Sequence, residues 1–245
     1  MNLQIALDHR AQVEQFRHKY RTGLVTLLFT DIVGSTKLKQ SLGDRDAVAL
    51  MHHHHAGVRE ILRQFPDGQE ISTAGDSFFL VFIKPSDAVR FALLLQARLR
   101  GLNQGSSHPV LDRIGIHIGE VVIEEREGAA KPRDLYGMQV DSCARVMSLG
   151  AGNQILLTRS AFDNARQALK GEEMAGLGAL SWLNHGTYQL AGVEEPVEIC
   201  EVGEANLAAL KQPPDSEKAR RAVVGDQETV LGWRPAAGQL VPNTK

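Results

Sequence analysis

The chain has 245 residues, 43% hydrophobic and 23% charged, which is a balance typical of soluble globular proteins and enough length for one large domain. Its 27 basic and 29 acidic residues give a formal net charge of −2 without a long basic run, so we expect no nucleic-acid partner. No apolar stretch approaches the roughly 20 residues that cross a bilayer, no signal peptide is evident, and Cys143 and Cys200 lie in no metal-ligand pattern, which together predict a reduced, cytoplasmic setting.

Hydrophobic spacing predicts helices and strands in irregular alternation. Val48, Met51, His55, Val58 and Leu62 follow the 3,4 spacing of one helical face, which makes the run from His52 to His55 part of a native helix. Residues 124–133 are charged and contain Gly and Pro, as in a flexible loop. In chain order, we expect helices at 8–20, 36–42, 48–65, 86–102, 135–149 and 159–169, and strands at 24–29, 70–73, 77–83, 113–123 (one bent strand or a pair), 154–157, 187–190 and 197–202.

This mixture predicts an α+β fold, a mixed α/β sandwich with one mainly antiparallel sheet flanked by helices. We expect a lead-in at 1–21, one folded domain at 22–202, and a linker or disordered tail at 203–245, where the pattern dissolves into Pro, Gly and polar residues. Such a tail leaves room for an attached regulatory or effector domain.

An acidic residue and a glycine turn follow the first predicted strand, in the run from Phe29 to Thr36. The turn opens a helix, so its free N–H groups and the positive end of the helix suit a polyphosphate. Asp31, at the end of the strand, can hold Mg²⁺ against those phosphates. The alternative is that Asp31 and Ser35 only cap the helix.

A second carboxylate, Asp76, lies at the tip of the predicted hairpin in Thr73-Ala74-Gly75-Asp76. Alone, a Gly-Asp pair between two strands is typical of an ordinary turn. Asp31 and Asp76 both lie beside buried strands, however, and two such carboxylates can meet and hold two Mg²⁺ ions.

A third group of polar residues lies between Asp134 and Arg145. Asp134 is predicted to cap a helix, on which residues 138, 141, 142 and 145 share one face. Asp141 and Arg145 are therefore neighbours one turn apart. The alternative is that they form only an exposed ion pair.

Together these segments resemble, in order and spacing, the catalytic domain of the class III nucleotidyl cyclases. Enzymes of this family convert a nucleoside triphosphate into its 3′,5′-cyclic monophosphate and pyrophosphate. The resemblance runs from about residue 22 to residue 202. It includes residues 113–122, similar to the family's glycine-rich core strand, and residues 192–199, similar to its closing hairpin. It implies a cyclase-like fold for the 22–202 domain.

The resemblance also implies one half of a site. Asp31 and Asp76 would bind two Mg²⁺ or Mn²⁺ ions, and Ile32 would offer its main-chain carbonyl to one of them. The turn formed by Val33, Gly34, Ser35 and Thr36 would hold the phosphates.

The other half would come from the partner chain of a head-to-tail homodimer. Arg145 would stabilise charge that develops at the α-phosphate, a role suited to its fixed fork of donors. Asp134 would accept a hydrogen bond from the adenine amino group. Ser72 and Asp141 would complete this half.

Three positions depart from the family's pattern. Ser72 stands where adenylyl cyclases usually have a lysine and guanylyl cyclases a glutamate, both of which read the base. Asp141 replaces an asparagine that positions the ribose, and Ala191 stands where many members have a lysine for the triphosphate. An added carboxylate near a triphosphate is worth on the order of 4 kcal/mol of repulsion at 4 Å. Weak or altered activity is therefore an open alternative.

We expect an adenylate cyclase, a phosphorus–oxygen lyase of intracellular signalling that makes cyclic AMP. Because Asp134 needs an amino group opposite it, ATP ranks first, CTP and GTP follow, and UTP is last. A cyclase for CTP or GTP, and a catalytically silent domain that dimerises to regulate a partner, remain the alternatives.

Overall fold

The computed structural model describes residues 20–125 and 133–222. The helices are α2 (Ser35–Leu42), α3 (Asp44–Leu62), α4 (Pro85–Asn103), α5 (Met138–Leu149) and α6 (Arg159–Ala168), and the strands are β1 (Tyr20–Ile32), β2 (Gln69–Ala74), β3 (Ser77–Phe82), β4 (Asp112–Glu125), β5 (Arg133–Tyr136), β6 (Ile155–Thr158), β7 (Leu180–Leu190), β8 (Val197–Glu204) and β9 (Ala219–Arg221). Every element predicted between residues 24 and 202 is present. The predicted helix at 8–20 lies almost entirely outside the described residues, as does most of the predicted loop at 124–133.

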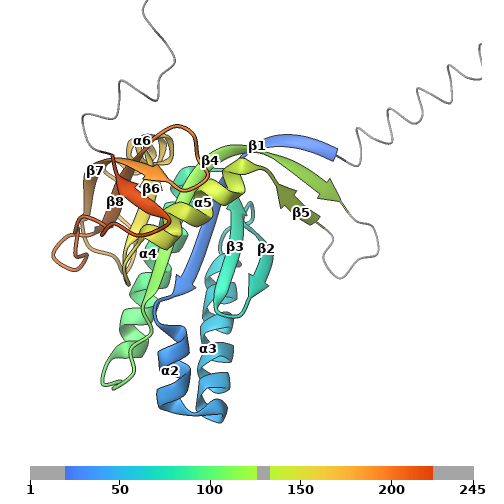
Figure 1. The fold of residues 1–245 in the computed structure, drawn as a ribbon. Helices are drawn as coiled ribbons and strands as arrows, with labels where there is room; N and C mark the ends of the chain where they lie inside the picture. The colour runs from blue at the N-terminus through green and yellow to red at the C-terminus, as the bar shows by residue number, and fades with distance from the viewer. Residues whose placement is uncertain (1–19, 126–132, 223–245) are drawn as a thin grey trace, which may run out of the picture.

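One sheet organises the described residues (Figure 1). Its strand order is β2-β3-β1-β4-β6-β8-β7-β9, and β5 pairs with the outer part of β4. The β4–β6 pair is parallel, and the other pairs of named strands are antiparallel. The predicted α+β fold with a mainly antiparallel sheet is confirmed.

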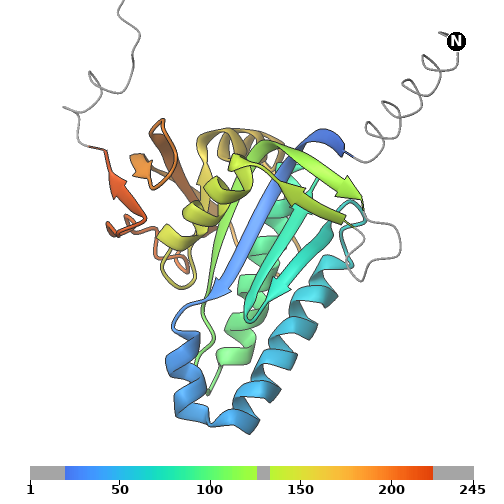
Figure 2. The ribbon, with the colours of Figure 1, turned by 45° about the vertical axis from the view of Figure 1, so that its right-hand side comes forward.

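Alternation along β1 explains the two layers on the sheet. Leu28 faces a core shared with α3, α4 and α6, whereas Leu27 faces a smaller core that contains Cys143 of α5. Figure 2 shows α5 crossing one face of the sheet, with α3 and α4 behind the other. Both predicted free cysteines are buried.

Two local predictions were wrong in detail. The stripe predicted on α3 included Val48 and His55, but Val48 is 55% exposed, and His54 is the buried histidine. The first half of α3 extends beyond the sheet beside α2 (Figure 1), so Val48 has no core to enter. His54 turns inward because the buried Asp112 accepts from its Nε2, at 2.9 Å.

Asp134 does not cap a helix. It lies on β5, and α5 begins only at Met138 after Gly137. Residues 133–136 instead pair with the outer part of β4, so the backbone groups of this segment are satisfied across strands. Such pairing depends on a strand distant in sequence, which a local capping pattern does not reveal.

The folded part of the chain continues past residue 202. Strand β8 extends to Glu204, and β9 adds to the edge of β7. Pro213 lies in the segment that connects β8 to β9, and its carbonyl accepts from the hydroxyl of the buried Tyr188 of β7, at 3.2 Å. The later part of the expected tail, residues 223–245, lies outside the described residues. Within the described ranges, no helix is both long and apolar enough to span a membrane.

Candidate active site

Asp31 lies at the end of β1, between two neighbouring strands. Arg113 of β4 is its register partner, and its guanidinium donates to one carboxylate oxygen from Nε at 3.1 Å and from Nη2 at 2.6 Å. Ser77 of β3 donates to the other oxygen at 2.5 Å. The carboxylate is therefore fixed from both sides by groups on the sheet.

Asp76 occupies the tip of the β2–β3 hairpin, next to Ser77. Gly75 before it has φ +62°, a left-handed conformation that suits glycine. Asp76 is only 8% exposed, and its Oδ1 accepts from the ammonium of Lys39, at 3.3 Å. Burial raises the pKa of Asp76, but hydrogen bonds from Ser35 and Lys39 outweigh burial and leave this pKa below its ordinary value. Asp76 is thus ionised at neutral pH, and its buried Oδ2 has no partner in the described part of the chain.

The turn from Val33 to Thr36 begins α2. Gly34 is the N-cap residue, with φ +71°, and no side chain caps the helix. The alternative in which Asp31 and Ser35 only cap α2 is therefore wrong: neither side chain makes a cap hydrogen bond, and the Asp31 carboxylate bonds to Arg113 and Ser77. The uncapped first turn leaves N–H groups available to an anion.

These features fit a metal that arrives with phosphates. Asp31 and Asp76 are joined through Ser77, and the unpartnered Oδ2 of Asp76 is a ready oxygen ligand. No group of three or more His, Cys, Asp or Glu side chains that could hold a metal occurs in residues 20–125 and 133–222. Mg²⁺ is commonly held by one or two carboxylates together with substrate phosphates, so two carboxylates beside the uncapped start of a helix suit it.

Asp141 and Arg145 lie on α5, which packs unusually close to β4. A Cβ at Gly115 would come within 2.3 Å of the main-chain nitrogen of Met147, and one at Gly119 within 2.4 Å of the Cβ of Gln139. The alternating glycines of β4 therefore create the groove that seats α5. This explains why the glycine-rich strand and the polar helix occur together in the sequence.

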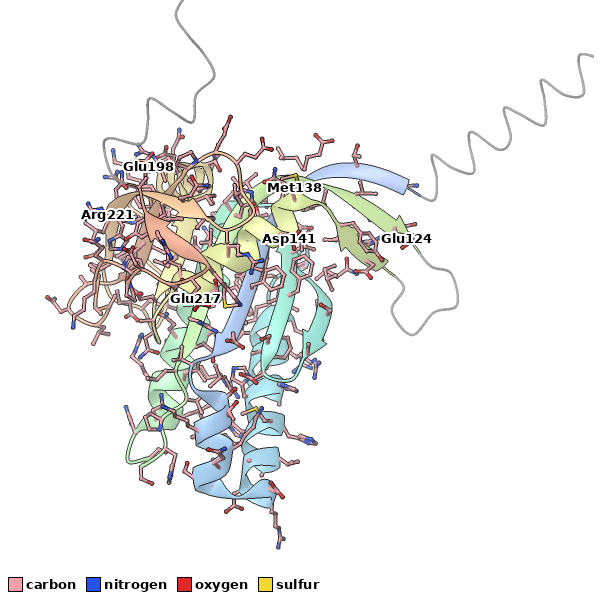
Figure 3. All side chains as sticks on the ribbon, viewed as in Figure 1. Glu124, Met138, Asp141, Glu198, Glu217 and Arg221 are labelled. Atoms are coloured by element: carbon pink, nitrogen blue, oxygen red, sulfur yellow. The ribbon has the colours of Figure 1, made fainter. Side chains whose placement is uncertain are left out.

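Asp141 and Arg145 do not form the ion pair considered from the sequence, as far as the structure describes the salt bridges. Asp141 is exposed on the first turn of α5 (Figure 3). Arg145 is half-buried, and its Nε is buried without a hydrogen-bond partner among the described residues. The guanidinium thus retains a donor that no described group satisfies.

The two residues predicted to contact the base lie on different strands, Asp134 on β5 and Ser72 on β2. Asp134 of β5 accepts from the main-chain N–H of Leu135 at 3.0 Å and from the hydroxyl of Tyr136 at 3.1 Å. Ser72 is half-buried on the edge strand β2, opposite Phe79.

Strand register shows how far apart the candidate groups lie. Asp31 pairs with residue 113 of β4, and Asp134 pairs with residue 124, which is 11 residues farther along the same strand. At about 3.3 Å per residue, that separation is roughly 35 Å along the strand. Figure 3 shows Glu124 near the outer end of β4. One chain therefore brings Asp31 and Asp76 together but keeps Asp134 far from them.

Lys39 and Arg113, the cations beside the two carboxylates, were not predicted from the sequence. Lys39 stacks four residues after Ser35 on α2, a spacing that could have placed both side chains on one face. Arg113 was identified only as the start of a strand, because its partner depends on the register between β1 and β4.

A family model for the adenylate and guanylate cyclase catalytic domain matches residues 18–179. The chain is 30% identical over 236 residues to the receptor-type adenylate cyclase GRESAG 4.3 of Trypanosoma brucei brucei, with 79% of this chain and 18% of that protein covered. It is 33% identical over 179 residues to an uncharacterized protein of Mycobacterium tuberculosis, with 71% of this chain and 54% of that protein covered. The chain thus spans only part of the length of these relatives.

Solved structures support the fold. An adenylate cyclase of Trypanosoma brucei in its monomeric state superposes with a TM-score of 0.65 at 24% identity, covering 80% of this chain and 94% of that one. The adenylyl cyclase CyaB of P. aeruginosa superposes with a TM-score of 0.64 at 20% identity, covering 77% and 98%. The guanylyl cyclase Cya2 gives 0.61 at 23% identity, covering 78% and 98%. Proteins named adenylyl cyclase and guanylyl cyclase thus both have this fold.

Proposed function

The chain belongs to the family of adenylate and guanylate cyclase catalytic domains, and we propose that it converts ATP into 3′,5′-cyclic AMP and pyrophosphate. The observation that carries this proposal is the carboxylate pair beside the uncapped start of α2. Asp31 and Asp76 are joined through Ser77, and the turn that follows Asp31 leaves N–H groups available to phosphates.

In this proposal, Asp31 and Asp76 hold two Mg²⁺ or Mn²⁺ ions per site, with the main-chain carbonyl of Ile32 as a further ligand. When bound, such ions lower the pKa of the ribose 3′-hydroxyl and stabilise charge on the phosphates. The main-chain N–H groups of Gly34, Ser35 and Thr36 donate to the triphosphate and orient it for attack by the 3′-hydroxyl. Val33 belongs to the same turn, but its N–H donates to the carbonyl of Leu111, at 2.9 Å.

Arg145 and Asp134 act on the other parts of the nucleotide. Arg145 donates to the α-phosphate oxygens, where charge develops in the transition state, and its unpartnered buried Nε supports this role. Asp134 accepts from the base amino group, while Ser72 offers a hydroxyl to the neighbouring ring nitrogen. Asp141 lies one turn before Arg145, near the ribose.

Asp134 reaches a nucleotide held at Asp31 only in a head-to-tail dimer. The separation of roughly 35 Å along β4 between the level of Asp31 and that of Asp134 exceeds the length of a nucleoside triphosphate. A second copy placed in the opposite direction brings its Asp134, Asp141 and Arg145 to the Asp31 of the first. Symmetry then creates two equivalent sites.

The base preference rests on Asp134. A carboxylate accepts only, so it favours adenine, which offers an amino group, and disfavours uracil, which does not. Cytosine offers an amino group too, and guanine can reach Asp134 only through its N1 or N2 edge. A cyclase for CTP or GTP is therefore the second candidate, and ATP ranks first.

A weak or silent cyclase-like domain is the remaining alternative, favoured by the exposed carboxylate of Asp141. Its negative charge repels the triphosphate, and Ala191 in place of a lysine removes a compensating positive charge, so both weaken triphosphate binding. Asp31, Asp76 and Arg145 favour activity instead, because a silent domain has no chemical need for all three.

Product analysis tests the proposal. Purified protein is incubated with Mn²⁺ and each of the four nucleoside triphosphates, and cyclic products are identified by mass spectrometry, with Asp76→Ala protein as the control. We expect cyclic AMP to form fastest and to be absent with the variant. Equal product with the variant would contradict the role of Asp76 as a metal ligand, and faster cyclic UMP or cyclic GMP would contradict the assignment of Asp134.

A further inference from the structure

Two cations neutralise the carboxylate pair, and they differ in how firmly they are held. The guanidinium of Arg113 bonds Asp31 through two nitrogens and also donates from Nη1 to the carbonyl of Ser148, at 3.3 Å. Lys39 makes one contact with Asp76, at 3.3 Å, and its side chain is 41% exposed. Arg113 is thus built into the sheet, whereas Lys39 is free to leave.

Lys39 also lies within reach of the start of α2. It follows Ser35 by four residues, so the two side chains stack on one face of the helix, and Lys39 bonds the carboxylate of Asp76. The ammonium of Lys39 therefore already lies at the level of the uncapped first turn. The buried, unpartnered Oδ2 of Asp76 points to a ligand at the same place.

We propose that Lys39 is an exchangeable counter-ion that pairs with Asp76 in the empty site and with the phosphate chain of the substrate in the loaded site. The proposal rests on the proposed function, since it needs a metal and a polyphosphate at this turn. It assigns a substrate-binding role to a residue that the motif itself does not include.

Charge favours the exchange of Lys39 between Asp76 and the phosphate chain. While Lys39 is on Asp76, it competes with a divalent cation for the same carboxylate. Once the cation is bound to Asp76, the ammonium is repelled by it, and the nearest remaining negative charge is the phosphate chain. A lysine suits this exchange because its charge is compact and its stem has several rotatable bonds.

The first arm of the test measures Mn²⁺ alone, by isothermal titration calorimetry, without nucleotide. Replacing Lys39 with Met keeps the helix-forming stem and removes the competing charge. Because the pair is partly exposed, we expect Lys39→Met to bind Mn²⁺ roughly three- to fivefold more tightly than the wild type. The matched control is Lys37→Met, which removes the same charge from the opposite side of α2 and should leave Mn²⁺ affinity unchanged.

The second arm measures inorganic tripolyphosphate in saturating Mn²⁺, which tests the phosphate chain without base or ribose. Here the same variant should bind roughly three- to fivefold more weakly, since a phosphate ligand has been lost. Lys39→Arg should restore tripolyphosphate binding, because a guanidinium also pairs with phosphate.

The opposite signs in the two arms distinguish exchange from a structural role. A lysine that only braces the hairpin against α2 would weaken both binding events and lower the melting temperature, and that result would overturn the proposal. Equal changes in Lys37→Met would also overturn it. Should Lys39→Met fold poorly, Lys39→Gln provides the same comparison. Neither arm depends on turnover, so a chain that makes no cyclic nucleotide but shows both shifts would contradict the proposed function and not the exchange.

Discussion

Arg113 and Asp31 face each other in register on β4 and β1, with two guanidinium nitrogens on one carboxylate oxygen. The same guanidinium donates to the carbonyl of Ser148 in the last turn of α5. Arg113 therefore joins the end of the strand that carries Asp31 to the helix that carries Arg145. In a head-to-tail dimer these two elements serve different sites.

Replacing Arg113 should therefore affect stability as well as turnover. Arg113→Met leaves the Asp31 carboxylate without its cation and the end of α5 without its donor, so we expect a loss of about 1–3 kcal/mol in the free energy of unfolding. Urea denaturation measures it. The control is Lys84→Met, which removes two weak contacts of an exposed lysine, with Asp67 and Asp87 at 4.0 Å each, and should change stability little. Equal losses in both variants would contradict a bridging role.

The close packing of α5 on β4 should not tolerate a methyl group at Gly115. In Gly115→Ala, the new Cβ would meet the backbone of Met147, so α5 must shift, at a cost of about 1–3 kcal/mol, and turnover should fall with Arg145 displaced. The control is Gly101→Ala in α4, where nothing lies within 4 Å of the added Cβ. There we expect unchanged or slightly higher stability, because alanine favours a helix. Thermal melts and turnover rates of both proteins check this prediction.

The carboxylate of Asp141 should lower kcat/KM for ATP. The exposed carboxylate repels the triphosphate, although solvent screens it, so Asp141→Asn should raise kcat/KM for ATP several-fold. The exposed Glu120 of β4 gives a control, Glu120→Gln, with the same charge change elsewhere. A fall in kcat/KM in Asp141→Asn would mean that the carboxylate itself takes part in the reaction.

Base selection should depend on Asp134 more than on Ser72. Asp134→Ala removes the acceptor for the amino group and should flatten the preference among nucleotides, whereas Ser72→Lys should sharpen the preference for ATP. Competition assays with paired ATP and GTP report the ratio of the two kcat/KM values directly. An unchanged ratio in Asp134→Ala would remove this residue from base recognition.

Local patterns in the sequence predicted a large part of this molecule. The apolar strand before Asp31 and the hairpin at Gly75-Asp76 are set by short-range chemistry, so both are present as expected. The partners of these carboxylates depend on register and helix packing between distant segments, so Arg113 and Lys39 were missed. Asp134 was misplaced for the same reason, because pairing with β4 prevails over a capping pattern. The burial of His54 instead of His55 likewise depends on Asp112, which is distant in sequence.

We propose above all that each site is built from residues of two chains, and mixing two inactive variants tests this most directly. Asp76→Ala and Arg145→Ala proteins should each lack turnover, because every site in either homodimer misses one essential group. After subunit exchange at equal amounts, half of the dimers are mixed and each contains one intact site, so about a quarter of the wild-type rate of cyclic AMP formation should return. No recovery despite exchange shown by native mass spectrometry would contradict a site built from two chains.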